Sequence, residues 1–146
     1  MERILVALDG SSRSPAVLTA AVALTKRVGG KLILFRAIGL PADMPPDVWK
    51  QPEQTLLDIL RHGALEYLSD RAKPLEGKVA AMRVGVGSPW QAICNQAHED
   101  DVDLIVIGSH GYGAIDRLLG TTAAKVVNHA DRSVLVVRGE RLAAAE

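Results

Sequence analysis

The stretch RILVALDGSSRSPAVLTAAVALTKRVGGKLILFRA, residues 3–37, places one helical pattern between two short aliphatic runs. The runs at residues 3–8 and 31–37 have the mainly apolar character of strands that are covered on both faces. Between them apolar residues recur at helical spacing, and Gly29-Gly30 marks the end of the helix. This pattern predicts a strand–helix–strand unit with parallel strands. The apolar helix face comprises Val17, Ala20, Ala21, Leu24 and Val28, with Ser12 or Ser14 as the N-cap and Pro15 in the first turn.

The rest of the chain repeats this alternation. Further strands are expected at residues 79–84, 103–108 and 133–138. Five strands alternating with four helices predict an α/β fold: an open five-stranded parallel sheet in the order 3-2-1-4-5, with helices on both faces, as in Rossmann-like domains. All 146 residues are expected to form one domain. The later helices carry Leu57, Leu60, Ala64 and Leu68 before Pro74; Ile93, Cys94 and Ala97 after Pro89; and Ala123, Val126, Val127 and Ala130.

Two connections stand out by composition. Residues 38–54 hold four of the seven prolines, and we interpret them as an excursion within the same domain, placed to act as a lid. The run Gly85-x-Gly87-Ser88-Pro89 lacks the spacing of a nucleotide-binding fingerprint and is expected to turn the third strand into the third helix.

Composition narrows the classes of function. Lys plus Arg and Asp plus Glu both number 17, so no broad positive surface is expected for nucleic acid or an anionic membrane. The single cysteine, Cys94, excludes an intramolecular disulfide and is expected to be a buried small hydrophobic residue. The start MERILVALDG does not resemble a signal peptide, and no apolar run approaches the roughly 20 residues that span a bilayer. A cytoplasmic protein is therefore expected.

A ligand is expected beyond the carboxyl ends of strands 1 and 4, where neighbouring crossovers leave toward opposite faces of the sheet. Asp9-Gly10-Ser11 and Gly108-Ser109-His110-Gly111 follow these two ends. Glycines at 108, 111, 113 and 120 would allow positive φ and close approach of a ligand, and Thr121 and Thr122 open a helix whose free N–H groups attract anions. The pattern suits a phosphate chain and an ordinary surface turn equally well.

Standard nucleotide and metal motifs are absent. The sequence has no G-x-x-x-x-G-K-[ST] loop, and Asp116 stands where a dinucleotide loop would have its third glycine. The four histidines show no zinc-ligand spacing. The nearest cations along the chain to the glycine-rich stretch are Arg117 and Lys125, so phosphates would be neutralised by backbone amides, a helix N-terminus and a metal ion.

The chain resembles the universal stress proteins over nearly its whole length. The segments ILVALDGS (4–11), VGVGSP (84–89), DVDLIVIGSHG (101–111) and SVLVVR (133–138) look like that family in the same order. Nucleotide-binding members carry Gly, two residues, Gly, about nine residues and then Gly-Ser or Gly-Thr. Here Gly108 and Gly111 are followed, after eight residues, by Gly120-Thr121.

The resemblance implies a regulatory module for stress tolerance that binds ATP, ADP or AMP. It implies that Asp9 reaches the ribose or adenine side, that Gly108 lies against the ribose, and that Mg²⁺ or Mn²⁺ bridges phosphate oxygens. Asp9 also suits a local turn or cap with Ser11 and Ser12. The remaining implied contacts are Ala7, Leu8 and the backbone of Ala37 at the base, and Gly111, Gly120, Thr121 and Thr122 at the phosphates.

The sequence leaves alternatives open for both catalysis and assembly. Only His110 and Asp116 could orient a water molecule, and no second motif supports either, so at most slow ATP hydrolysis is expected. The alternatives are a true ATPase or phosphotransferase, and a dimeric interaction protein that binds no nucleotide. Residues 133–138 would form a long aliphatic sheet edge, which predicts pairing with a second copy; the resemblance also implies a homodimer.

Overall fold

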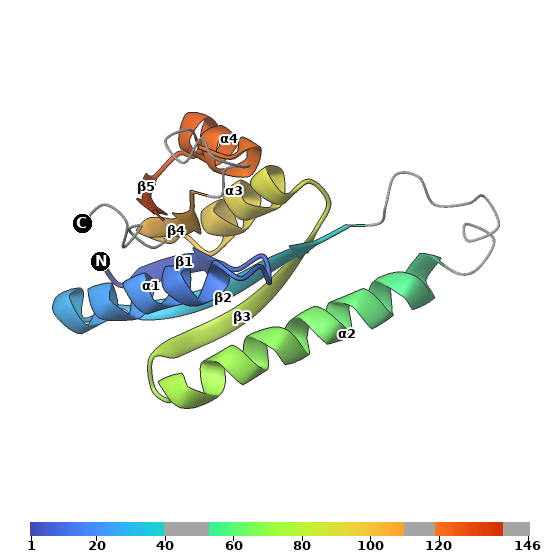
Figure 1. The fold of residues 1–146 in the computed structure, drawn as a ribbon, viewed down its shortest axis with the longest axis horizontal. Coiled ribbons are helices and arrows are strands. Elements are labelled where there is room, and N and C mark those ends of the chain that lie inside the picture. The colour runs from blue at the N-terminus through green and yellow to red at the C-terminus, as the bar shows by residue number, and fades with distance from the viewer. Residues whose placement is uncertain (40–52, 110–118, 139–146) are drawn as a thin grey trace, which may run out of the picture.

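The computed structural model describes residues 1–39, 53–109 and 119–138 (Figure 1). Strands and helices alternate as the sequence predicts. The connection at 40–52 lies outside the described residues, so its predicted role as a lid stays a prediction. The elements are β1 (Arg3–Ala7), α1 (Ser14–Val28), β2 (Lys31–Ile38), α2 (Glu53–Ala72), the 3-10 turn η2 (Lys73–Leu75), β3 (Val79–Val86), α3 (Pro89–Glu99), β4 (Leu104–Gly108), α4 (Thr121–His129) and β5 (Ser133–Val137).

The five strands form one parallel sheet in the order β3-β2-β1-β4-β5, which confirms the predicted fold class. The central strand β1 pairs with β2 on one side and β4 on the other, so that Leu5 lies opposite both Ile33 and Ile105. Sequence neighbours alternate between the two faces of a strand, and each face is covered by helices. In Figure 1, α1 and α2 cover one face of the sheet and α3 and α4 cover the other.

Each face of the sheet has its own apolar core. Leu5, Phe35 and Ile105 face α3 and α4. Ile4 and Val6 face α1 and α2. All five side chains are fully buried, and burying an aliphatic or aromatic side chain of this size contributes roughly 1.5–3 kcal/mol. The sheet is therefore packed on both faces.

Helix boundaries differ from the prediction in detail. The N-cap of α1 is Arg13, not Ser12 or Ser14, and Gly29 in the left-handed conformation (φ 80°) ends the helix. The buried stripe of α1 includes Thr25, whereas Val28, predicted on that face, is 41% exposed. Thr25 can be buried because its hydroxyl donates a hydrogen bond to the Val22 carbonyl oxygen at 2.7 Å.

The other predicted helix faces are largely confirmed. The predicted turn is also found, because Gly87 has φ 115° and Ser88 is the N-cap of α3. Cys94 is only half-buried, and burial together with the negative charge of Asp131 raises the pKa of its thiol. Val127, predicted to pack against the sheet, is 45% exposed, since α4 is short and only Ala123 and Val126 are buried.

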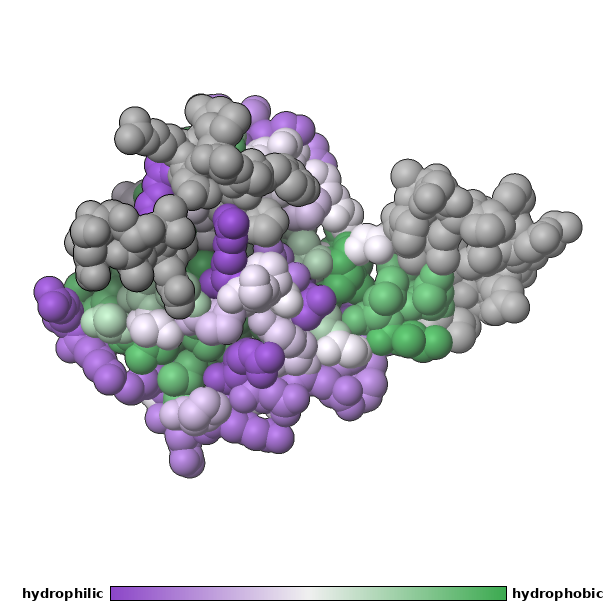
Figure 2. All heavy atoms as spheres, viewed as in Figure 1, coloured by the Kyte–Doolittle hydropathy of each residue, from purple (hydrophilic) through white to green (hydrophobic). Residues whose placement is uncertain are grey.

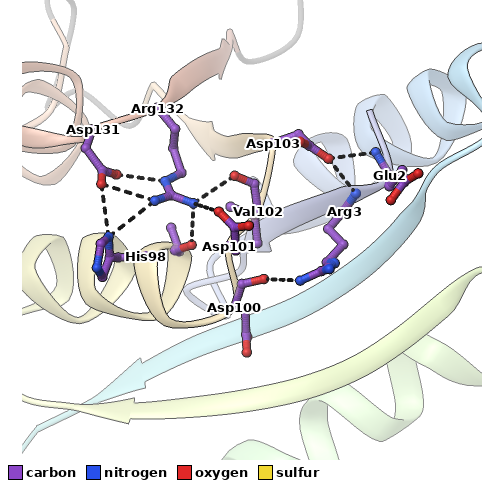
Figure 3. A network of polar contacts seen from close by, with 10 residues as sticks. Glu2, Arg3, His98, Asp100, Asp101, Val102, Asp103, Asp131 and Arg132 are labelled. Carbon is purple, nitrogen blue, oxygen red and sulfur yellow. Dashed lines mark hydrogen bonds and ion pairs between the residues drawn. The ribbon is translucent and has the colours of Figure 1, made fainter.

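A polar network fastens the amino ends of the strands (Figure 3). Arg132 Nη1 donates to the carbonyl oxygens of Ala97 and Val102, both at 2.8 Å, which ties the end of α3 and the segment before β4 to the segment before β5. Its Nε and Nη2 donate to the Asp131 carboxylate at 2.7 and 3.1 Å. These bonds, together with one from His98, lower the pKa of Asp131 well below its ordinary value.

Exposed apolar side chains are spread over several elements, among them Val28, Val86 and Val127. Figure 2 shows one green area around the beginning of α2, and Ile59 on this helix is 63% exposed. Among the described residues no helix combines the length and apolarity needed to cross a membrane.

Candidate functional site

A pocket of about 390 Å³ opens at the carboxyl edge of the sheet. It lies where the chain leaves β1 toward α1 and leaves β4 toward α4, which is the position predicted from the strand order. The ends of β1, β2 and β4 form its floor, and the first residues of α1, α3 and α4 form its walls. The lining residues are Ala7, Leu8, Asp9, Ser11, Arg13, Ser14, Val17, Phe35, Arg36, Ala37, Pro89, Ile93, Ile107, Gly108, Thr121, Thr122 and Ala123.

The structure brings most of the predicted site residues together at this pocket. Gly120 lies next to the pocket as the buried N-cap of α4 but is not part of the lining. Gly111 lies outside the described residues, as do His110 and Asp116, the two candidates for orienting water. The predicted residues that line the pocket are Ala7, Leu8, Asp9, Ala37, Gly108, Thr121 and Thr122.

The carboxylate of Asp9 is fixed by the turn that follows β1. Its Oδ1 accepts hydrogen bonds from the Ser11 N–H and the Ser14 hydroxyl, both at 2.9 Å. The Ser14 hydroxyl also accepts from the Gly10 N–H at 3.1 Å, and Gly10 takes the positive φ of 78° that this tight turn requires. The turn expected for Asp9 is therefore present, with Ser14 in the place of Ser12, and it holds the carboxylate at the pocket.

Gly108 and Gly120 do not use the positive φ that the sequence suggested. Gly120 is extended (φ −62°, ψ 164°), and its N–H donates to the Ser109 carbonyl oxygen at 2.8 Å. Gly108 also lies outside the left-handed region, but a Cβ there would lie 3.1 Å from Val17 Cγ2. Gly108 thus permits close packing of α1 on β4, a reason for the glycine that the sequence does not disclose.

The electrostatic character of the pocket is set by three helix N-termini. None of the N-caps Arg13, Ser88 and Gly120 makes a side-chain capping hydrogen bond. The partial positive charge of each helix start, equivalent to about half an elementary charge, is directed toward the pocket. This convergence favours an anionic ligand.

Sequence reasoning missed the two cationic side chains of the pocket. Arg13 precedes α1 and Arg36 lies near the end of β2, and both line the pocket. Arg117 lies outside the described residues, and Lys125 lies over the Trp90 ring at 5.8 Å. Arg36 could have been found from its position in the sequence, because it directly precedes the predicted site residue Ala37 at the same edge of the sheet.

The described residues offer no ready-made metal centre. Across residues 1–39, 53–109 and 119–138, no three His, Cys, Asp or Glu side chains gather closely enough to hold an ion. Among the described residues that line the pocket, Asp9 is the one carboxylate. A divalent cation in this pocket would therefore depend on oxygen ligands from a bound phosphate.

Comparison with known proteins agrees with the arrangement of strands and helices. Residues 1–138 match the model of the Universal stress protein family. The chain belongs to this family. A curated universal stress protein relative from Staphylococcus aureus (strain USA300) is 32% identical over 148 aligned positions, which cover 98% of this chain and 87% of the relative.

Solved structures of this family share the fold of the chain. Universal stress protein UspA from Lactobacillus plantarum superposes with a TM-score of 0.77 and 27% identity, over 94% of this chain and 97% of that one. A universal stress protein solved in complex with cAMP gives a TM-score of 0.64 and 28% identity, over 95% and 98% of the two chains.

Proposed function

We propose that this universal stress protein is a cytoplasmic regulatory module of the stress response that binds an adenine nucleotide, ATP or its di- or monophosphate, and hydrolyses it slowly at most. The observation that carries the proposal is the pocket itself. Three helix N-termini and Arg13 line it, and its floor is apolar. A nucleotide combines an apolar aromatic base with an anionic phosphate chain, and so matches both parts.

The base is proposed to lie over the ends of β1 and β2. There Ala7, Leu8 and Ala37 border it, and Phe35 and Ile107 extend the apolar floor. These residues are small or aliphatic apart from Phe35, so the floor can accept a flat ring without a buried polar group that needs a partner.

The ribose is proposed to lie beside Asp9 and Gly108, and the phosphates at the start of α4. The turn at Ser11 and Ser14 fixes the orientation of the Asp9 carboxylate, which suits a ribose hydroxyl donor. Gly111, Gly120, Thr121 and Thr122 would hold the phosphates through N–H groups and hydroxyls, and Mg²⁺ or Mn²⁺ would neutralise phosphate oxygens. The relative in complex with cAMP supports an adenine nucleotide as the ligand class.

The proposal is tested by native purification followed by denaturation and mass spectrometry of the released small molecules, together with calorimetric titration of ATP and Mg²⁺. Binding is expected in the wild-type protein. Gly120→Val should weaken it by placing a side chain at the start of α4. Gly63→Ala is the matched control, since Gly63 lies in α2, away from the pocket, with nothing within 4 Å of an added Cβ. Absence of both released and titrated nucleotide contradicts the proposal.

We also propose that two copies pair through residues 133–138. The support is that β5 is an edge strand of the sheet and that Leu135 on it is 38% exposed. Such an edge presents unpaired backbone groups beside apolar side chains and is normally covered. A dimeric mass in light scattering at micromolar concentration is expected, and Leu135→Lys should shift it toward the monomer; a monomeric wild-type mass contradicts this assembly.

A further inference from the structure

Arg36 lies at the border between the pocket and the face of the sheet that α1 and α2 cover. It is the sixth residue of β2, lines the pocket, and its side chain leaves the strand on the face opposite to that of Ala37. Since Ala37 packs with the core under α3 and α4, Arg36 projects toward the α1 and α2 side. The guanidinium therefore does not compete with a base that rests on Ala37.

The guanidinium is held by contacts that leave its polar edge unused. An ideal Cβ on Gly10 would lie 2.9, 2.9 and 3.0 Å from Nη1, Nη2 and Cζ of Arg36. Three nearly equal distances place Gly10 over the flat face of the group. The same guanidinium lies over the Tyr67 ring, with Cζ 4.6 Å from the ring centroid. The absence of a side chain at Gly10 and the ring of Tyr67 fix where the guanidinium lies.

Among the residues that the structure describes, no oxygen accepts a hydrogen bond from the N–H groups of Arg36 and no carboxylate pairs with it. Arg132 provides the contrast, since its guanidinium donates to two carbonyl oxygens and to the Asp131 carboxylate. An arginine that is oriented by stacking, and whose N–H fork has no protein acceptor, is suited to bind a phosphate in a bidentate manner.

The strand order decides which phosphate this would be. β2 and β4 lie on opposite sides of β1. A ribose at Asp9, beyond the end of β1, would direct its 5′ phosphates toward Gly108 and the start of α4, on the β4 side. Arg36 lies near the end of the strand on the other side, with its guanidinium close to Gly10, the neighbour of Asp9. It is therefore positioned for the 2′ and 3′ edge of the sugar, not for the 5′ chain.

We propose that Arg36 determines specificity for adenine nucleotides that carry a phosphate on the 2′ or 3′ oxygen of the ribose. This inference rests on the proposed nucleotide site and narrows its ligand class. The chemistry is that of α/β dinucleotide-binding folds, in which an arginine near the ribose accommodates a 2′-phosphate.

The test compares adenosine 2′,5′-bisphosphate and adenosine 3′,5′-bisphosphate with 5′-AMP by calorimetric titration of the full chain. All three share the base and the 5′ phosphate, and the bisphosphates differ from 5′-AMP only in the added monoester. The wild-type protein should bind one of the bisphosphates about tenfold or more tightly than 5′-AMP. Arg36→Gln should abolish that preference and leave the affinity for 5′-AMP within about twofold of the wild-type value. Arg36→Lys should keep only part of the preference, because lysine has the charge without the two parallel N–H donors of the guanidinium.

Arg71→Gln is the matched control. Arg71 lies over the same Tyr67 ring at 4.5 Å but lines a different groove, between α1 and the end of α2. The preference should survive this change, and circular dichroism should show each variant folded. The inference is overturned if the wild type does not discriminate among these nucleotides, if Arg36→Gln weakens all three equally, or if Arg71→Gln removes the preference as fully. If ATP and 5′-AMP bind and neither bisphosphate is preferred, the nucleotide site stands and this inference alone fails. If no adenine nucleotide binds, both fail.

Discussion

Substitution of Gly108 by alanine tests whether the pocket edge is shaped by helix packing. The new Cβ would lie 3.1 Å from Val17 Cγ2, a few tenths of an ångström inside ordinary contact, and Val17 is only 4% exposed. Overpacking of this kind costs about 1–3 kcal/mol, and the lower entropy of the unfolded alanine chain offsets about 0.4–1 kcal/mol of it. We therefore expect Gly108→Ala to lower the free energy of unfolding by about 1 kcal/mol.

A double-mutant cycle identifies the cause. Val17→Ala removes two methyl groups and should cost about 2 kcal/mol, at ~0.8 kcal/mol per group plus a cavity term. It also removes the atom that Gly108→Ala would strike, so in that background only the entropic gain remains and the second substitution should stabilise by about 0.4–1 kcal/mol. The coupling should be about 1.5–2 kcal/mol, measured by urea unfolding followed by circular dichroism. If Gly108→Ala costs the same in both backgrounds, contact with Val17 does not explain the glycine.

Three further outcomes are expected from urea unfolding. Gly63→Ala should stabilise the protein by about 1 kcal/mol, because Gly63 lies inside α2 with free space around it. Gly77→Ala should destabilise it by about 1 kcal/mol, because Gly77 has φ 82°. If both substitutions change the free energy of unfolding in the same direction, this reasoning is wrong. Arg132→Ala should cost about 2 kcal/mol, because two carbonyl oxygens lose a charged donor, and a neutral result would refute the clamp. The hydrogen bonds from Arg132 lower the pKa of Asp131, so the stabilisation from this pair is present above the ordinary pKa of 3.8 and is lost as the pH falls below it. Asp131→Asn should therefore flatten the decline in the free energy of unfolding below pH 3.8.

The strand order and the place of the pocket could be predicted from the sequence because both follow from local patterns. Mainly apolar strands separated by helical segments permit few topologies, and the carboxyl ends of neighbouring strands then define one edge. The burial of Thr25 was not predicted, because hydropathy ranks threonine as polar and does not register the hydroxyl bond to Val22 that permits it. The exposure of Val28 and Val127 was missed because periodicity does not show how far a helix extends past the sheet.

The cationic part of the pocket could not be predicted, because it depends on the reach of long side chains. Arg36 approaches Gly10, 26 residues earlier in the chain, and Tyr67, 31 residues later. Distances along the sequence gave Arg117 and Lys125 as the nearest cations instead. Arg132 donates to carbonyl groups of α3 and of the connection between α3 and β4. This pairing is equally non-local, and depends on that connection, where Asp101 takes a positive φ of 48°.

The clamp made by Arg132 holds the amino ends of the strands, whereas the pocket opens at their carboxyl ends. Mutations that change which ligand binds need not disturb the hydrogen bonds of Arg132, and mutations that remove these bonds need not change the residues that contact the ligand. Proteins that evolve from such a chain could therefore bind different small molecules while the scaffold stays the same.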